Sequence, residues 1–414
     1  MEKFKLTSLE RKWVLYDVAN SAFTMMVSTI IPIYFNSLAK GAGISEVDYL
    51  AYWGYTISIS TVIVAILGPL VGAASDKKGR KKKLFAATIA IGSILCFFLG
   101  MIHQWLVFLF LFALAKIFYS VSLVIYDSTL SDVTDDSRMD DVSSQGYAWG
   151  YIGSCVPFVA CLVLVLMSDK IGISQGTAMM LAFMITALWW FGVSTPLLKV
   201  YEQKHYAEGP AEKHYILAEL GTSLKEIAGN KKVLLFLLAF FFYIDGVYTI
   251  IDMSTAYGSA LGLGSTDMLL ALLVTQVVAF PSAIIMGRLS RTKDPVKLIS
   301  VCIGAYFCIA MFAFFMTSAW QFWVLAVTVG MFQGGIQALS RSYFAKIIPP
   351  EKSGAYFGFY DICGKGASFI GTTMMGLVSQ ITGKVNNGVL VIAAFFLVGM
   401  VFFRMSAATR LKNK

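Results

Sequence analysis

The most constraining feature of the sequence is a series of long apolar segments, each about as long as a membrane-spanning helix. A hydrocarbon core about 30 Å thick is crossed by roughly 20 apolar residues in an α-helix. Twelve segments of this kind follow one another along the chain. Their approximate bounds are 13–38, 50–74, 84–102, 105–127, 143–168, 177–198, 233–260, 267–287, 296–316, 319–343, 354–381 and 387–405. The sequence therefore predicts an all-α integral membrane protein with twelve transmembrane helices.

The composition excludes most soluble classes of protein and offers little for catalysis. Apolar residues make up 57% of the chain and charged residues 14%, whereas soluble domains have about 25% charged residues. All six cysteines lie inside apolar segments, and none of the three histidines lies deep in one. No ATP-binding loop of the Walker type is present in the sequence. We therefore expect no enzyme activity, no cofactor and no bound metal.

Lysine and arginine are distributed very unequally between the two sides of the membrane. With both termini on one side, that side receives 28 of the 33 basic residues, and the other receives only Lys40, Lys170 and Lys384. Positively charged connections stay in the cytoplasm, so we expect cytoplasmic N and C termini. The net charge of +9 follows from this topology; it favours contact with anionic membrane lipids and does not indicate nucleic-acid binding.

A long hydrophilic connection at 199–232 divides the apolar segments into two sets of six. It predicts an N-terminal six-helix bundle at 1–198, a cytoplasmic linker at 199–232 and a C-terminal six-helix bundle at 233–414. Residues 215–224 of the linker are more apolar and suit a short amphipathic helix on the membrane surface.

The two sets of segments look like distant copies of each other. Gly72 and Gly287 lie 215 residues apart, and each opens a short basic loop between the second and third segments of its half. Glycine and aromatic residues also recur at 146–151 and 355–360, a pair that chance alone could produce. Together with the central linker, these features predict two pseudo-symmetric bundles, as in transporters built from repeats.

The loop after the second segment resembles the signature of the major facilitator superfamily. Gly72, Asp76, Gly79, Arg80 and Lys81 match its pattern of a glycine, an acid and a Gly-Arg-Lys run. Glycine permits close helix approach, and an acid beside basic residues can form a charge-assisted network that locks the cytoplasmic side. We therefore assign these residues to a gate; the alternative is that the lysines at 77–83 only enforce topology.

Four further stretches carry a more specific resemblance: 13–23, Asp245-Gly246 with Thr249, 334–342 and 357–361. They resemble the vacuole-effluxer-like branch of that superfamily, whose eukaryotic members are associated with amino-acid release from vacuoles during autophagy. The resemblance implies the major facilitator fold and a transporter. The compact basic loops look more like a bacterial member, in the inner membrane, whose cargo need not be the same.

Polar residues inside the first segment point to a cavity or a gate. A charged residue near the bilayer centre costs roughly 2.5–3.5 kcal/mol, so it needs a partner or water. Asp17, Asn20 and Ser21 are spaced i, i+3 and i+4, which places them on one helical face. Thr7 and Glu10 resemble a capping box that already closes the helix start, so Asp17 is available for another role.

The seventh segment, which corresponds to the first in the second half, carries the sharpest signal. Asp245, Thr249 and Asp252 are spaced i, i+4 and i+7 on one face. Two ionised acids on one face repel each other, so one of them can hold a proton, as a proton-coupled carrier requires. A structural ion pair with a lysine would explain the same residues without coupling.

Other polar residues offer partners for these acids and for a ligand. Lys116 and Asp127 in the fourth segment are close to three helical turns apart and share a face. Asp361 and Lys365 are spaced i, i+4; they either neutralise each other or leave Lys365 to meet a carboxylate. Further along the chain, Gln333 and Gln337 can bind a polar ligand or a neighbouring helix, and Arg341 is assigned to the gate.

These patterns predict a monomeric secondary active or facilitative transporter that works by alternating access. Its substrate would be a small polar or zwitterionic solute, in the first place an amino acid, with protons as a candidate coupling ion. A lipid or amphiphile translocator with an apolar lateral opening, a sugar or organic-acid carrier and a non-transporting receptor are the alternatives. The predicted substrate-binding residues are Asp17, Asn20, Ser21, Asp245, Thr249, Asp252, Gln333, Gln337, Asp361 and Lys365. The predicted gating residues are Gly72, Asp76, Gly79, Arg80, Asp127 and Arg341.

Overall fold

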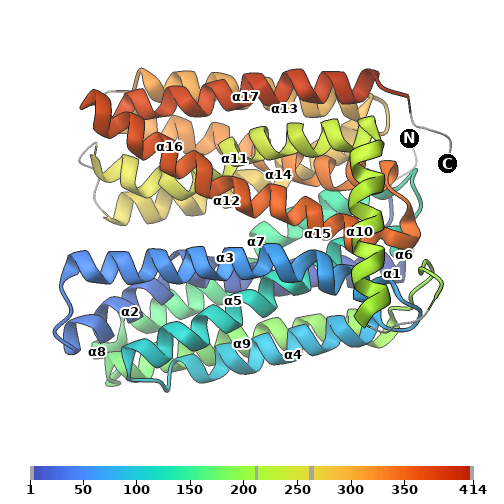
Figure 1. Ribbon diagram of the computed structural model, residues 1–414. Coiled ribbons are helices and arrows are strands. Elements are labelled where there is room, and N and C mark those ends of the chain that lie inside the picture. The colour runs from blue at the N-terminus through green and yellow to red at the C-terminus, as the bar shows by residue number, and fades with distance from the viewer. Residues whose placement is uncertain (1–3, 210–212, 261–264, 317, 411–414) are drawn as a thin grey trace.

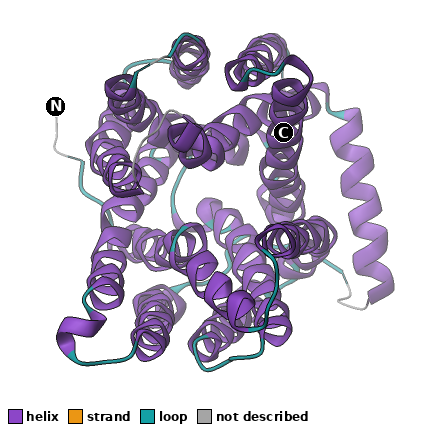
Figure 2. Cartoon of the chain, turned by 90° about the vertical axis from the view of Figure 1, so that its left-hand side faces the viewer, coloured by secondary structure: helices purple, strands orange, loops and turns teal. Residues whose placement is uncertain are grey.

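A computed structural model describes residues 4–209, 213–260, 265–316 and 318–410. Most helices of the chain run side by side in two groups, and both chain termini lie at the same end of the molecule (Figure 1). This end is called the termini end below, and the opposite end is called the far end. Figure 2 looks along the helices from the far end and shows the two groups end-on.

The first group is formed by the helices before the linker: α1 (Ser8–Ser28), α2 (Ile30–Gly41), α3 (Glu46–Asp76), α4 (Lys81–Leu99), α5 (Trp105–Ser128), α6 (Leu130–Val133), α7 (Met139–Leu166), α8 (Ser168–Ile171) and α9 (Gln175–Val200). The second group contains α11 (Lys231–Ala260), α12 (Ser265–Leu289), α13 (Pro295–Phe314), α14 (Ala319–Ile347), α15 (Ser353–Asp361), α16 (Ala367–Thr382) and α17 (Val385–Ala408). A 3-10 turn, η1 (Pro350–Lys352), precedes α15, and a π-helical turn, η2 (Ile362–Gly366), joins α15 to α16. The predicted all-α membrane fold of two six-helix bundles is confirmed.

The count of membrane-spanning helices differs from the predicted twelve for a local reason. Eleven helices among the described residues are long and apolar enough to cross a membrane. The segment predicted at 354–381 is the exception, because η2 divides it into two shorter helices. A π-helical turn inserts an extra residue into an α-helix and is often found at functional sites. Here it places Asp361 and Lys365 at the two ends of the irregular turn.

The start of α1 follows the sequence prediction. The Thr7 hydroxyl accepts a hydrogen bond from the Glu10 amide at 3.2 Å, and the Thr7 amide donates to the Glu10 carboxylate at 2.7 Å. The predicted capping box is therefore confirmed. Glu10 also forms an ion pair with Arg138 at 2.7 Å, which ties the start of α1 to the start of α7.

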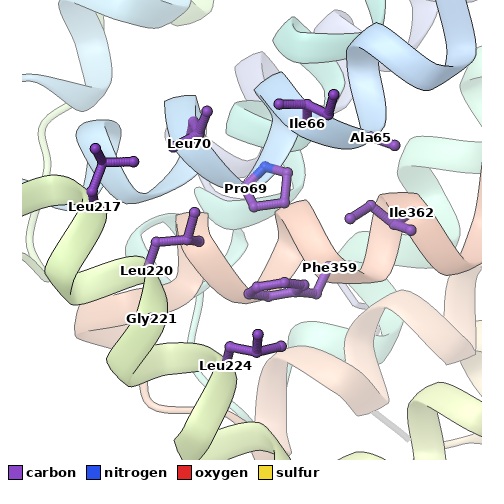
Figure 3. A pocket seen from close by; sticks show the side chains of 10 residues that line it. All are labelled: Ala65, Ile66, Pro69, Leu70, Leu217, Leu220, Gly221, Leu224, Phe359 and Ile362. Atoms are coloured by element: carbon purple, nitrogen blue, oxygen red, sulfur yellow. The ribbon is translucent and has the colours of Figure 1, made fainter.

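The linker contains the helix α10 (Lys213–Gly229), which includes the residues predicted as a short amphipathic helix and lies across the other helices at the termini end (Figure 1). An ion pair of 2.6 Å between Glu226 and Lys352 holds it against the second group. Between α3, α10 and the α15–η2 segment lies an open, almost entirely apolar groove of about 470 Å³ (Figure 3). Its lining includes Ile66, Pro69, Leu70, Leu220, Leu224 and Phe359.

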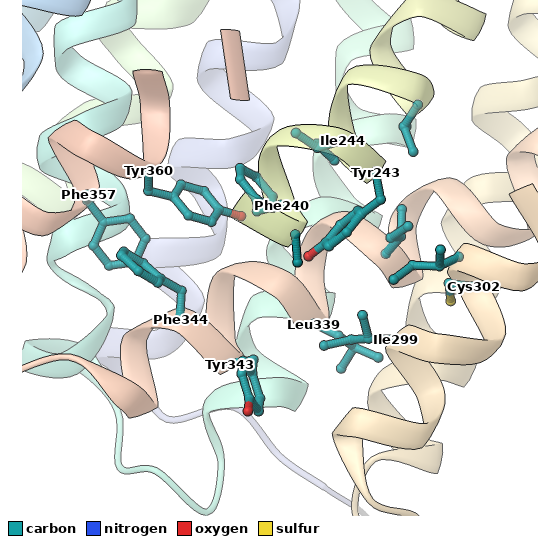
Figure 4. Close-up of a cluster of buried hydrophobic side chains, with 14 of the residues drawn as sticks. Phe240, Tyr243, Ile244, Ile299, Cys302, Leu339, Tyr343, Phe344, Phe357 and Tyr360 are labelled. Atoms are coloured by element: carbon teal, nitrogen blue, oxygen red, sulfur yellow. The ribbon is translucent and has the colours of Figure 1, made fainter. Parts of the chain in front are cut away.

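The buried apolar residues form two clusters that differ in which group they join. The larger cluster contains residues of both groups, such as Trp13 and Tyr126 from the first and Phe240 and Tyr360 from the second. In its second-group part, shown in Figure 4, the rings of Phe240 and Tyr360 stack with centroids 3.9 Å apart. The smaller cluster contains residues of the first group only. Apolar packing therefore joins the two groups through the larger cluster.

Candidate functional site

Two glycine pairs lie at a close crossing between the groups. Gly68 and Gly72 on α3, and Gly354 and Gly358 on α15, have the same spacing of four residues. A Cβ on Gly72 would collide with the Gly354 carbonyl, and a Cβ on Gly358 would lie 2.5 Å from the Pro69 backbone nitrogen. Small residues let helix backbones approach this closely in membranes. The crossing brings the end of α3 to the start of α15.

Asp76 caps α15 from the other group. Its carboxylate accepts hydrogen bonds from the amides of Gly354 at 2.8 Å and Ala355 at 2.9 Å. The first amides of a helix have no partner within the helix and carry a partial positive charge, so an acid is well placed there. Lys81 lies 3.3 Å from Asp76 and donates to the Ser353 hydroxyl at 2.9 Å. Asp76 and Lys81 are both almost completely buried.

Two neighbouring residues of the same loop have different surroundings. Gly79 has a positive φ of 71° and donates its amide to Gln203 of the linker at 3.0 Å. The Arg80 side chain is exposed, and within the described residues it makes no hydrogen bond or ion pair. In this conformation Lys81, rather than the predicted Arg80, supplies the basic contact of this loop with the second group.

Arg341 of α14 is the centre of a second network between the groups. Its guanidinium lies 3.2 Å from the carboxylate of Asp17 and 3.0 Å from that of Asp127. It also donates to the Ser143 hydroxyl at 2.9 Å, and it lies 4.3 Å from the ring centre of Tyr147. A guanidinium can make all of these contacts at once because its five donors are held in one plane. Since α1, α5 and α7 supply the partners, Arg341 joins three helices of the first group to one of the second.

The residues predicted to line a cavity from α1 lie in this packed region instead. Asp17 accepts a further hydrogen bond from the Tyr126 hydroxyl at 2.9 Å. Asn20 is buried and donates to a backbone carbonyl of its own helix, and the Ser21 hydroxyl lies against Gly150 of α7. The three residues do share one face of α1, but that face packs against neighbouring helices. Their spacing along the sequence predicts the shared face and not the structure opposite it.

A third set of contacts between the groups lies at the end of α12. Its position corresponds to that of the Gly72–Asp76 contacts at the end of α3, but the residue types differ. Arg291, which is 215 residues after Asp76, forms a two-bond ion pair with Asp141 at the start of α7, with both bonds 2.7 Å long. These hydrogen bonds raise the pKa of the Arg291 guanidinium, so the arginine stays charged. Gly287 packs against Ser144 of α7, as Gly72 packs against Gly354 of α15. The termini end is therefore closed by equivalent contacts from each half.

One more ion pair joins the groups at the same end. Asp140 lies 2.7 Å from Lys346 and accepts a hydrogen bond from the Ser342 hydroxyl at 2.6 Å. With the pairs of Arg341 and Arg291, it brings the ion pairs between the described parts of the two groups near this end to four. Asp140, Asp141 and Arg291 were not among the predicted gating residues, although acids at the start of one apolar segment and a base after another indicate such a pair.

Asp245 of α11 is completely buried. It has no exposed surface, and one carboxylate oxygen accepts from the Thr249 hydroxyl at 3.1 Å and from the Gly371 amide at 3.2 Å. Within the described residues, the other oxygen has no hydrogen-bond partner and no basic side chain pairs with the carboxylate. Asp252, predicted to share this face, is exposed. Asp245 and Thr249 thus pack against Gly371 of α16.

The remaining predicted ligand residues lie between the groups. Lys365 forms an ion pair of 2.6 Å with Asp361, and both side chains keep some exposed surface. Gln337 is buried and accepts a hydrogen bond from Tyr151 of the first group at 2.6 Å. Gln333, one turn away, is also buried, and its side-chain oxygen has no partner among the described residues. Asp127 pairs with Arg341, so its predicted neighbour Lys116 is left for another role.

The arrangement of two helix bundles around polar residues, closed at one end by contacts between the bundles, defines a membrane transporter of the major facilitator class. The structure of FucP in the outward conformation, a Major Facilitator Superfamily transporter, has a TM-score of 0.72 at 15% identity and covers 97% of this chain and 98% of that one. This similarity shows the fold.

A family model described as vacuole effluxer Atg22 like matches residues 8–414, and the chain belongs to this family. The uncharacterized MFS-type transporter YxiO of Bacillus subtilis is 42% identical over 405 residues, which cover 96% of this chain and 94% of that protein. Autophagy-related protein 22-1 of Aspergillus fumigatus is 23% identical over 272 residues, which cover 59% of this chain and 44% of that protein. The resemblance to this family is confirmed, and these relatives indicate no catalytic family.

Proposed function

We propose that the protein is a secondary active or facilitative transporter of small polar or zwitterionic solutes, with amino acids as the substrate class. The observation that carries this proposal is the set of ionisable residues inside the apolar segments, apart from those that close the termini end. Lys116 and Asp252 lie in helices long and apolar enough to span a membrane, and Asp361 and Lys365 lie at the η2 turn of the segment predicted at 354–381. A charge at such a depth needs a partner, a ligand or water. The amino-acid class is taken from the resemblance to vacuole effluxers, a description that the matching family model also carries.

We further propose that the termini end faces the cytoplasm of a bacterial cell and that the protein acts as a monomer in the plasma membrane. The unequal distribution of lysine and arginine supports this orientation. In this proposal Asp17 and Asp127 act with Arg341 as the inner gate, and Asp76 acts with Lys81 as a second part of it. Alternating access then requires these contacts to break when the far end closes.

Asp245 is the proposed proton-binding residue. An ionised carboxylate that is buried without a basic partner costs several kcal/mol, whereas a protonated one keeps its hydrogen bonds without that cost. Thr249 and Gly371 hold one carboxylate oxygen, and the other is free to carry the proton. Release of that proton would then require α11 and α16 to separate and admit water.

The test is uptake and counterflow of a labelled amino-acid panel in proteoliposomes, with and without an imposed pH gradient. Native protein is expected to give saturable uptake that the gradient stimulates. Asp245→Asn, which resembles the protonated form, is expected to retain exchange and lose the stimulation. Asp169→Asn, at an exposed acid near the far end, is the matched control and should behave as native protein. If folded native protein transports no amino acid, the substrate class is wrong.

A lipid or amphiphile translocator is the second candidate, and one observation favours it. The groove between α3, α10 and the α15–η2 segment is open and almost entirely apolar, as a lateral entry for a lipid would be (Figure 3). The same proteoliposomes can be loaded with a lipid carrying a fluorescent headgroup that an external reductant bleaches. Protein-dependent loss of the protected fluorescence, without amino-acid uptake, would favour this candidate over the first.

A further inference from the structure

The short segment before α1 contacts both groups at the termini end. The ring centre of Phe4 lies 4.5 Å from the guanidinium carbon of Arg138 and 4.6 Å from that of Arg291. Arg138 directly precedes α7 of the first group, and Arg291 follows α12 of the second. One aromatic ring therefore contacts a cation from each half.

Both arginines are held in place by acids. Glu10 accepts hydrogen bonds from Arg138 at 2.7 and 2.8 Å, and Asp141 accepts two from Arg291, both 2.7 Å long. These hydrogen bonds raise the pKa of both guanidinium groups, so both stay charged. Arg138 also donates to the backbone carbonyl of Lys5 at 2.8 Å, which fixes the segment before α1 on the first half.

The contact between Phe4 and Arg291 depends on the closed state. The contacts of Arg138 lie within the first half and can persist when the halves move apart, whereas Arg291 belongs to the second half. A guanidinium over an aromatic face is attracted to it, and more strongly where water is partly excluded. Phe4 is partly buried, and the side chain of Arg291 is only 24% exposed. Phe4 therefore adds to the closed state a contact that separation of the halves removes.

We propose that Phe4 restrains opening of the termini end: Arg138 holds its ring on the first half, and the ring binds Arg291 of the second. This inference rests on the proposed transport by alternating access and applies to any substrate. It adds an uncharged residue to the ion pairs that close this end. The segment before α1 thereby sets how often the protein opens to that side.

The test measures opening by alkylation of a buried cysteine with N-ethylmaleimide. Ser144→Cys is introduced into full-length protein after replacement of the six native cysteines. Ser144 is buried and packs against Gly287 of the second group, so the reagent reaches this position when the groups separate. At low reagent concentration, where reclosing outpaces alkylation, the rate is proportional to the open fraction. Phe4→Ala should raise this rate about fivefold, the factor expected for a cation–π contact at a partly exposed site.

A second reporter separates opening of the whole end from local exposure. Ser128 is buried at the end of α5, and its carbonyl accepts a hydrogen bond from the Ser353 hydroxyl of the second group at 3.0 Å. Phe4→Ala should accelerate alkylation at Ser128→Cys as well as at Ser144→Cys. Acceleration at Ser144→Cys alone would mean that Phe4 only covers that position, and would overturn the proposal.

Further variants test the contact between ring and cation. Phe4→Trp keeps an aromatic face and should leave alkylation as slow as with Phe4. Phe4→Leu keeps an apolar side chain without a ring and should behave as Phe4→Ala. In Arg291→Met, Phe4→Ala should give no further increase, because the partner is already absent. Lys5→Ala is the matched control: it removes an exposed side chain, keeps the carbonyl that binds Arg138, and should leave the rate unchanged.

The outcomes distinguish the restraint from the transport function. Unchanged alkylation at both reporters in Phe4→Ala, or an equal effect of Phe4→Ala with and without Arg291, would overturn the restraint. Neither result would affect the transport proposal, which uptake in proteoliposomes tests separately. If Phe4→Ala accelerates alkylation at both reporters while folded native protein transports nothing, the restraint stands and the proposed function is wrong.

Discussion

Replacement of Arg341 by methionine should open the termini end, because this residue is the only basic partner that the described structure gives Asp17 and Asp127. Removing one partner of a buried ion pair costs about 3–5 kcal/mol, since the remaining charge stays buried. The cost applies to the closed state only, because the two acids regain water once the groups separate. At about 1.4 kcal/mol for each factor of ten, the ratio of closed to open molecules should fall by a factor of about 10² to 4 × 10³.

The ratio of closed to open molecules is measured by double electron–electron resonance (DEER) between spin labels at Ser137 and Lys293. Both positions are exposed, follow α6 and α12, and lie on opposite groups at the termini end. The labels are introduced after replacement of the six native cysteines. Arg341→Met should add a longer distance that native protein lacks, and Arg341→Lys should add less of it.

The control is Arg288→Met, which removes an exposed arginine at the same end of the molecule. It should leave the distance distribution unchanged. An unchanged distribution in Arg341→Met as well, in folded protein, would refute the reasoning that this ion-pair network holds the groups together.

Two further predictions concern the contact between α3 and α15. Gly72→Ala should also populate the longer distance, because the new Cβ would overlap the Gly354 carbonyl, which is backbone and cannot turn aside. Gly54→Ala on the same helix meets nothing within 4 Å and should have no effect; equal effects of the two changes would exclude a steric cause. Asp76→Asn should lower the stability of the closed state by about 1.5–3 kcal/mol, because an amide can accept only one of the two amide hydrogen bonds of α15 well. A thermal melt in detergent measures this loss, and a melting temperature equal to that of native protein would contradict it.

The sequence predicted most of the fold because membrane helices must satisfy their backbone internally, so length and apolarity alone locate them. The eleventh span, at 354–381, was predicted as one continuous helix, but η2 interrupts it at Ile362–Gly366. Such a turn changes neither the composition nor the length of an apolar segment, so hydropathy does not reveal it. The capping box of α1 was predictable because both of its residues are local in the sequence.

The site was less predictable because its contacts join residues far apart in the chain. Asp76 was assigned to a gate from its loop, but its partner is the start of a helix 278 residues later. Asp17 was assigned to the ligand from its helical face, whereas the residue opposite that face is Arg341. Helical spacing tells which side chains share a face, and tertiary packing alone decides what that face meets.

Comparison of the two halves shows which features of the gate are the same in both copies. At the equivalent crossings, Gly72 and Gly287 both remain small, because any larger residue would meet the facing helix. Four residues after each glycine, Asp76 binds the backbone amides of α15, whereas Arg291 binds the carboxylate of Asp141. Where two helix backbones approach closely, only a small side chain fits, whereas a polar contact between the groups requires only that its two partners be complementary. An alignment of the two halves should therefore find the helix crossings by their glycines. It should find the polar contacts of Asp76 and Arg291 only if opposite charges are allowed at the same position.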